Sequence, residues 1–439
     1  MISLLKGVIF MSIIDKLRKE DTPERRAAEL AKMRQMAMEK KHEIIESAKL
    51  RFNTYCIGVG RAGIHFLDAI YEVDTRTNVN QVFPLALPSS KYDYQMADNL
   101  NKREEFIFPF GASDRDVRYT GVGGDQHLGQ EIAIEEGRRI LSKAREDIET
   151  IDREVPVKSI TLIGSLAGGT GGGGIPVLAK MIKDNFPDQL IIIMGILPER
   201  QEGNAFLVNA SRSFNMIMNL RNELADKYID VFFLFENTIV RKSGMLQSYD
   251  KINHELASTF NLLFGSTYSP DTQDPHDKLK ILKKGGSKGV GMMRYVGDQE
   301  VDTLNPQTDM EVEDAKSEIV RMLKKNLAEY PAGTAESGRY GIYQVRCDQN
   351  IFPFDVRNIL TNNFEVHLQK GGSDKVAFVK GGIWPNPGSN EVDIATMILG
   401  IDYTKYDYLR KVKEWWRHWY EEEDVINDFQ EILSTEVVI

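Results

Sequence analysis

The sequence predicts an α/β fold, in which a parallel-sheet domain is joined by a long central helix to an α+β C-terminal domain. Short runs rich in β-branched and aromatic residues alternate with segments of helical periodicity over the first half of the chain. Glycine-rich turns follow several of these runs, where the strands of a parallel sheet would end. An amphipathic segment then precedes a region of mixed strand-like and helical pattern.

Composition and charge are those of an ordinary globular protein. The 439 residues are 42% hydrophobic and 27% charged, and their number is enough for two domains. The net charge of −10 leaves no basic excess to neutralise phosphates, so nucleic acid is not expected as a partner. The two cysteines, Cys56 and Cys347, cannot form a disulfide framework and suit a reducing cytoplasm. The seven histidines show no metal-ligand spacing with them, so no protein-held metal is expected.

Residues 1–51 are typical of a charged helical arm that precedes the first domain. Thr22 is a good helix N-cap and Pro23 suits the first helical position. The apolar opening of the chain is too short to cross a bilayer and lacks a secretory cleavage site. Met1 and Met11 are alternative starts of the protein.

Strand and helix patterns alternate from residue 52 onward. The runs that predict strands are 54–59, 82–87, 106–110, 159–163, 190–197 and 230–235. The segments that predict helices are 61–73, 129–150, 175–186 and 205–228. Continuous apolar strands between helices are typical of a parallel sheet covered on both faces, and such sheets bind ligands beyond the carboxyl ends of their strands.

The second half begins with a further predicted helix, residues 249–266. An α+β region is expected from about 286 to 401, with strands at 340–346, 375–383 and 392–401. The tail carries an aromatic stripe at helical spacing, formed by Tyr408, Val412, Trp415, Trp416 and Trp419. We expect this stripe to pack on the protein itself, with a membrane or partner contact as the alternative.

The turn GVGRAG follows the first predicted strand and contains Gly58, Gly60 and Gly63 in a GxGxxG pattern. Such glycines let backbone N–H groups approach a pyrophosphate at a helix N-terminus, and a tight strand–helix turn is the alternative. A dinucleotide-binding enzyme would also carry an acidic residue at the end of its second strand. The corresponding LALPSS has none, which argues against NAD.

Two further glycine-rich turns precede predicted helices. AGGTGGGG, residues 167–174, can form a concave nest of N–H groups for an anion, and Thr170 adds a hydroxyl donor. A flexible linker does not suit a loop between a buried strand and a helix. TGVGGDQHLG, residues 120–129, is the third such turn. Three of them on one sheet predict a nucleoside di- or triphosphate held by backbone, and the absence of GxxxxGK[ST] excludes a Walker-type site.

AGGTGGGG resembles the GGGTGSG signature of the tubulin and FtsZ superfamily of self-assembling GTPases, with Ala167 in place of the first glycine. The resemblance covers residues 52–401, and ILPERQEGNAFLVNASRSF and YDKINHELASTFNLLFGS are most similar to the archaeal CetZ branch. It implies the following organisation: a GTP-binding domain at 52–248, a central helix at 249–268, an activation domain with an acidic catalytic loop at 269–401, and a helical tail at 402–439.

The resemblance also implies which residues bind GTP or GDP. The phosphate loops would be formed by Gly58, Gly60, Arg61, Ala62, Gly121, Gly123, Gly124, Asp125, Ala167, Gly168, Gly169, Thr170, Gly171 and Gly172. Glu202 would bind the ribose, and the base would contact Asn237, Tyr249 and Asn253. The i, i+4 spacing puts the last two on one helix face, and an amide can satisfy both donor and acceptor groups of guanine. Core packing for Tyr249 and a local cap for Asn253 are the alternatives.

The resemblance implies that the hydrolytic residues act on the nucleotide of the next subunit. The matching segment, SPDTQDPHDKLKIL at 269–282, places Asp274 and Asp277 at the two acidic positions. One carboxylate could orient the attacking water while Mg²⁺, held mainly by phosphates and water, and the neighbour's backbone loops fix the phosphates. A solvated acidic loop is the alternative.

Three positions depart from the family pattern: Pro88, Phe206 and Thr272. Two functions therefore stay open. One is a GTPase that polymerises head to tail into cytoskeletal filaments and organises cell shape, in the cytoplasm or at the inner membrane surface. The other is a nucleotide-binding regulator that neither polymerises nor hydrolyses efficiently. In either case the arm or the tail could contact a membrane or an adaptor.

Overall fold

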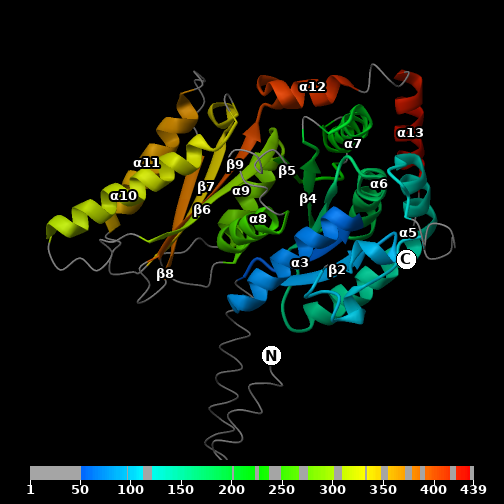
Figure 1. Ribbon diagram of the computed structural model, residues 1–439, viewed down its shortest axis with the longest axis horizontal. Helices are drawn as coiled ribbons and strands as arrows, with labels where there is room; N and C mark the ends of the chain where they lie inside the picture. Colours follow the sequence, from blue (N-terminus) through cyan, green and yellow to red (C-terminus); the bar gives the residue numbers. More distant parts are fainter. Residues whose placement is uncertain are drawn as a thin grey trace, which may run out of the picture. The chain divides into compact units, whose positions relative to one another are not determined.

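The computed structural model describes thirteen segments of the chain, residues 51–95, 97–111, 121–199, 202–222, 227–236, 249–265, 275–300, 309–331, 334–347, 354–370, 378–385, 391–415 and 422–435. Leu50–Ile439 is one compact unit. At its centre is a nine-stranded sheet in the order β2-β1-β3-β4-β5-β6-β9-β7-β8 (Figure 1). The predicted arm, residues 1–51, lies outside the described residues except for Arg51.

The first half of the sheet is parallel, and its strands are β1 (Thr54–Val59), β2 (Val82–Leu87), β3 (Ser159–Ser165), β4 (Leu190–Leu197) and β5 (Val231–Glu236). Both faces are buried, which explains why the strands read as continuous apolar runs. In β1, Tyr55 and Ile57 belong to one hydrophobic core and Cys56 to the other.

Helices cover both faces of this parallel half (Figure 1). One core is closed by α3 (Gly60–Arg76), α8 (Tyr249–Phe264) and α9 (Pro275–Gly286). The other is closed by α5 (Gln126–Asp152), α6 (Gly169–Asn185) and α7 (Asn204–Asn222). The fold class predicted from the sequence is therefore confirmed.

The second half of the sheet contains β6 (Val290–Glu300), β7 (Tyr340–Cys347), β8 (Phe378–Pro385) and β9 (Glu391–Ile401), with the helices α10 (Asp309–Ala328) and α11 (Phe354–Gln369). β6 pairs in parallel with β5 through Phe233 and Gly291, and β9 runs antiparallel to both β6 and β7. β7 and β8 are parallel to each other. Thus β6, β7 and β8 point in the same direction as the first five strands.

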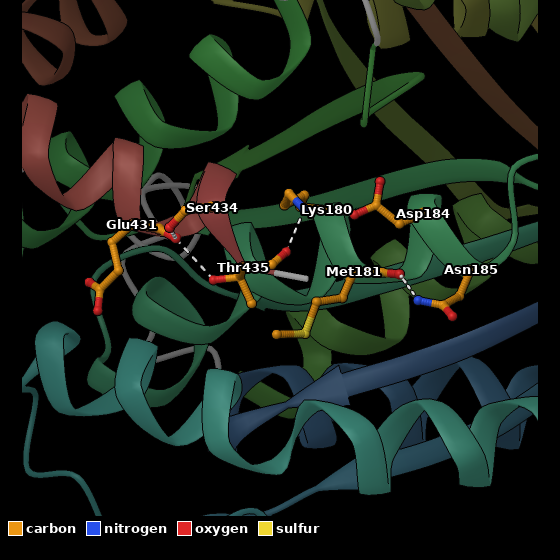
Figure 2. A network of polar contacts seen from close by, with 7 residues as sticks. All are labelled: Lys180, Met181, Asp184, Asn185, Glu431, Ser434 and Thr435. Atoms are coloured by element: carbon orange, nitrogen blue, oxygen red, sulfur yellow. Dashed lines mark hydrogen bonds and ion pairs between the residues drawn. The ribbon is translucent and has the colours of Figure 1, made fainter. Parts of the chain in front are cut away.

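The tail folds back onto the protein as α12 (Asp407–Trp415) and α13 (Glu422–Ser434). Tyr408 and Val412 are buried where α12 packs on α7, which confirms that the stripe packs on the protein at these positions. Trp416 and Trp419 lie outside the described residues. The α13 end is held by Lys180 of α6, whose Nζ donates to the Thr435 carbonyl at 2.6 Å and to Asp184 at 2.7 Å (Figure 2).

Four element predictions are wrong. The helix predicted at 205–228 ends at Asn222, and residues 227 and 228 are not helical. Residues 106–110 do not form a strand, because the chain makes a 3-10 turn at Glu104–Phe106 and only a single bridge from Ile107 to β2. The helix expected at 175–186 already begins at Gly169. The predicted loop at 269–282 contains the start of α9 at Pro275.

No helix among the described residues is both long enough and apolar enough to cross a membrane.

Candidate functional site

Two helices begin side by side at the carboxyl edge of the sheet, α3 after β1 and α6 after the adjacent strand β3. Their N-cap residues, Val59 and Gly168, make no side-chain hydrogen bond to the first turn. The first four N–H groups of a helix have no partner within it, and the helix dipole makes this end positive. Two uncapped N-termini at one point are therefore suited to an anion.

The GVGRAG turn after β1 and the AGGTGGGG turn after β3 meet at Gly60 and Thr170. Gly60 has a φ of +67°, and a Cβ there would lie 3.0 Å from the Thr170 Cβ. The Thr170 hydroxyl is 2.8 Å from that of Ser89, in the turn after β2. Ser89 is itself fixed, because its N–H and hydroxyl donate to Asp93. The ends of β1, β2 and β3 thus converge on Thr170.

The third glycine-rich turn, residues 121–124, lies beside the other two. Gly121, Gly123 and Gly124 all have positive φ, and the space within 4 Å of a Cβ at either of the last two is empty. Asn209 of α7 joins this turn to the loop after β3, since its Nδ2 donates to the carbonyls of Gly124 at 2.9 Å and Ala167 at 3.1 Å. Asn209 was not predicted, because its position in the sequence of α7 does not distinguish it from the other polar residues of that helix.

Close packing of α5 on α6 accounts for part of the glycine run. A Cβ at Gly172 would lie 2.0 Å from Gln126 Nε2, and one at Gly173 would lie 2.1 Å from the Gln126 carbonyl. Gln126 and Ser213 also fasten the preceding loop, because both donate to the Leu166 carbonyl, at 2.8 and 2.9 Å. These glycines are thus required by helix packing, a role that the sequence pattern alone does not reveal.

Other predicted phosphate-loop residues lie around the same point. Asp125 is the N-cap of α5, and its carboxylate accepts from the N–H groups of His127 and Leu128 at 2.9 and 3.1 Å. Its charge therefore already has helix partners. In the first turn of α3, Arg61 is exposed and Ala62 is half-buried. Gly58 lies near the end of β1, Gly60 begins α3, and Gly169–Gly172 form the first turn of α6, whereas Gly121, Gly123, Gly124, Ala167 and Gly168 lie in the loops at this edge.

The residues predicted for ribose and base are described only in part. Glu202 is half-buried and stabilises its own turn, because its Oε1 accepts from the Glu199 N–H at 3.0 Å. Asn253 is half-buried on α8, and Tyr249 is the first residue of that helix. Asn237 and the Tyr249 side chain lie outside the described residues.

The predicted catalytic acids do not join the glycine turns. Asp277 lies in the first turn of α9 and forms an ion pair with Lys380. Lys380 is near the beginning of β8, a strand that points the same way as β1 to β5. Asp277 is therefore at the amino edge of the sheet, opposite the glycine turns. Asp274 lies outside the described residues.

Neither of the two sheet edges offers a ready-made metal site: the described part of the chain contains no group of three or more His, Cys, Asp or Glu side chains placed to hold an ion. A cation bound with an anionic ligand at the carboxyl edge would need ligands from that anion and from water.

The family model of the Tubulin/FtsZ family, GTPase domain, matches residues 53–240. Tubulin-like protein CetZ1 of Haloferax volcanii is 32% identical over 245 residues, which cover 54% of this chain and 58% of CetZ1. The match thus spans little more than half the length of that relative. Tubulin-like protein CetZ of Pyrococcus horikoshii is 24% identical over 353 residues, 80% of this chain and 86% of that protein.

Solved structures share the fold. The GDP-bound monomer of CetZ1 from Haloferax volcanii has a TM-score of 0.67 at 24% identity, covering 83% of this chain and 99% of that one. The GTPγS-bound protofilament of CetZ2 from the same organism has a TM-score of 0.65 at 22% identity, covering 86% and 99%. An FtsZ dimer from M. jannaschii has a TM-score of 0.58 at 15% identity, covering 82% and 92%.

Proposed function

Because residues 53–240 match the Tubulin/FtsZ family, GTPase domain, we propose that this chain binds guanosine nucleotides and assembles head to tail, with GTP hydrolysed between subunits. The observation that carries the proposal is the separation of two partial sites. The uncapped N-termini of α3 and α6 lie at the carboxyl edge of the sheet. Asp277 lies at the amino edge. Stacked subunits would bring these two edges together.

Backbone groups of the three glycine turns are proposed to hold the phosphates. Gly60, Thr170 and the turn at 121–124 surround the uncapped helix ends, and a Cβ at Gly123 or Gly124 would have no described atom within 4 Å. A polyphosphate would place negative charge beside these positively polarised N–H groups. Glu202 is proposed for the ribose, and Asn237, Tyr249 and Asn253 for guanine. Mg²⁺ would be held mainly by phosphates and water.

The rim of the carboxyl edge supports an interface there. Tyr92, in the turn after β2, is 55% exposed, and Phe206, at the start of α7, is 47% exposed. A contact between this edge and the amino edge of a second copy is heterologous, and such contacts extend into open filaments unless the rotation closes a ring. The CetZ2 structure with GTPγS is a protofilament, which supports the same mode of assembly here.

Asp277, together with Asp274, is proposed to orient the water that attacks the neighbour's nucleotide. Phosphoryl transfer depends mainly on positioning and charge stabilisation, so a fixed carboxylate at the interface is sufficient protein chemistry. The hydrogen bond from Lys380 fixes the Asp277 side chain at the amino edge, where the neighbouring subunit is proposed to bind.

The second candidate function is a nucleotide-binding protein that does not hydrolyse efficiently. The same ion pair favours it, because a carboxylate neutralised by Lys380 of its own chain is a weaker acceptor for water. Pro88, which occupies the turn between β2 and Ser89, also departs from the family pattern.

The GTPase rate per molecule, measured against protein concentration together with sedimentation, separates the two functions. We expect a rate that rises steeply above a threshold concentration, accompanied by pelletable filaments with GTP and fewer with GDP. ATP under the same conditions is the control and should support neither. A flat rate near zero with GTP bound would favour the regulator, and failure to bind GTP would refute both.

A further inference from the structure

A cavity lies at the amino edge of the sheet, between the end of α7, the turn before β6 and the end of β9. Its volume is about 220 Å³. The charged side chains that line it are Arg221, Lys288, Glu336, Arg339, Asp402 and Lys405. It is separate from the glycine turns, which are at the carboxyl edge.

Arg221 forms the floor of this cavity and is only 1% exposed. Its Nη2 donates to the Gly289 carbonyl at 2.5 Å and also to the Gly286 carbonyl. Its Nε is buried and has no hydrogen-bond partner among the described residues. Burial lowers the pKa of Arg221 to about 10, so the side chain is still cationic at neutral pH. Its Nη1 also approaches the Met218 sulfur at 3.8 Å, so Arg221 contributes a fixed positive charge behind the cavity wall.

The other cations surround the same space. Arg339 is half-buried, and Lys288 and Lys405 are exposed at the rim. Arg339 and Lys288 lie on either side of Gly400, whose φ is +74°. A Cβ at Gly400 would lie 3.3 Å from the Cβ atoms of both residues, so their side chains begin close together.

The two carboxylates of the cavity differ, because Asp402 is hydrogen-bonded within its own turn whereas Glu336 Oε2 is buried with no hydrogen-bond partner among the described residues. Asp402 Oδ1 accepts from the Thr404 N–H at 3.0 Å and from its hydroxyl at 2.6 Å. Glu336 lies near His367 of α11: burial lowers the pKa of that imidazole, and the Glu336 charge opposes the effect. Four cations against two carboxylates leave the lining with a net charge of +2.

We propose that this cavity binds a small dianion carrying a phosphoryl group, either inorganic phosphate or a phosphomonoester. The Arg339 guanidinium offers the planar, forked donors that suit phosphate oxygens, Lys288 and Lys405 add ammonium groups at the rim, and a net charge of +2 matches a dianion. A volume of about 220 Å³ accommodates phosphate or a short phosphomonoester but not a nucleoside triphosphate.

Binding there would join the two halves of the sheet. Arg221 belongs to α7, which covers the parallel half, whereas Lys288 and Arg339 precede β6 and β7 of the second half. Between these halves, β5 and β6 are paired only through Phe233 and Gly291 among the described residues. An anion shared by these side chains would strengthen this junction, so its binding should raise the melting temperature of the whole protein.

Titration of the full-length, GDP-saturated protein with inorganic phosphate, followed by ³¹P NMR and calorimetry, tests the proposal. We expect saturable binding of one phosphate per chain and a melting temperature that rises with phosphate concentration. The double variant Lys288→Gln/Arg339→Gln should bind at least tenfold more weakly. Lys283→Gln, an exposed lysine of α9 outside the cavity, is the matched control and should bind as the wild type does.

Glycerol phosphate titrated in the same way distinguishes the two ligand classes: tighter binding than inorganic phosphate identifies a phosphomonoester site, and weaker binding identifies a phosphate site. Two results would overturn the proposal. One is the absence of saturable binding by either probe. The other is binding that survives Lys288→Gln/Arg339→Gln but is lost in Gly123→Asp, which would place the anion at the glycine turns instead.

Discussion

At the residue scale, the glycine turns are positioned by a few polar side chains from other elements. Ser89 meets Thr170, Asn209 bridges two turns, and Gln126 with Ser213 fastens the loop after β3. These hydrogen bonds link the turns to one another and to the elements around them. The proposed phosphate site would therefore consist of main-chain donors supported by a side-chain frame.

Substitutions at Gly123 test the phosphate-binding role of the third turn. Asp and Asn both tolerate positive φ, and a Cβ at this position meets no atom within 4 Å, so either residue should fold normally. Gly123→Asp places a negative charge beside the phosphates and should weaken GTP binding at least tenfold. Gly123→Asn has nearly the same shape without the charge and should stay within about threefold of the wild type. Equal affinities of the two variants in equilibrium dialysis would remove this turn from the site.

Asp74 should give the stability of the protein a marked pH dependence. It is buried near the amino end of β2, and burial raises its pKa to about 7, although the Gln81 and Val82 N–H groups donate to its Oδ2 at 2.9 and 3.1 Å. Because the folded pKa lies above the unfolded value of 3.8, the folded state binds more protons between these values. Stability should therefore fall as pH rises from about 4 to about 7.

Asp74→Asn tests this dependence, since an amide keeps an acceptor for the two N–H groups and carries no charge. At pH 8 the variant should melt several degrees above the wild type, and at pH 5, where only part of the ionisation penalty has developed, the difference should be clearly smaller. Thermal unfolding at both pH values measures the difference. A shift of the same size at pH 5 and pH 8 would show that the buried charge is not responsible.

At the element scale, several strands and helices were predictable because local pattern and tertiary environment agree. The apolar runs of β1, β2 and β4 are buried on both faces, and the structure reproduces the predicted bounds 54–59, 82–87 and 190–197. The start of α6 was not predictable, because glycine has low helix propensity and only the close approach of α5 requires it there. Likewise Asn209 depends on contacts between elements distant in the chain.

The docking of α13 gives an element-scale prediction. Ile432 is fully buried against the main core, whereas Ile426 in the same helix is 52% exposed. Ile432→Ala removes buried methyl groups, a change that costs about 2–5 kcal/mol in a well-packed site. We expect a clearly lower melting temperature for this variant and almost no change for Ile426→Ala, measured by calorimetry. Similar values for the two would mean that α13 does not stay docked in solution.

At the scale of the whole molecule, one continuous sheet separates the two proposed parts of the GTPase site. Because β1 to β8 point in one direction and only β9 is reversed, the glycine turns and the Asp277–Lys380 pair lie at opposite edges. The sequence motifs predicted the residue types of both parts. Their separation within one molecule depends on strand direction, which follows from long-range pairing that no local pattern contains.

The most direct test of this account is a mixing experiment with two variants that are each defective at a different edge. Gly123→Asp should bind GTP at least tenfold more weakly but keeps Asp277, and Asp277→Ala should bind GTP but lacks the carboxylate; the GTP concentration is chosen so that it saturates only the second variant. We predict that each variant alone hydrolyses GTP at least tenfold more slowly than the wild type, and that an equimolar mixture regains a substantial part of the activity. A mixture no more active than the sum of its components would contradict a site shared between neighbouring subunits.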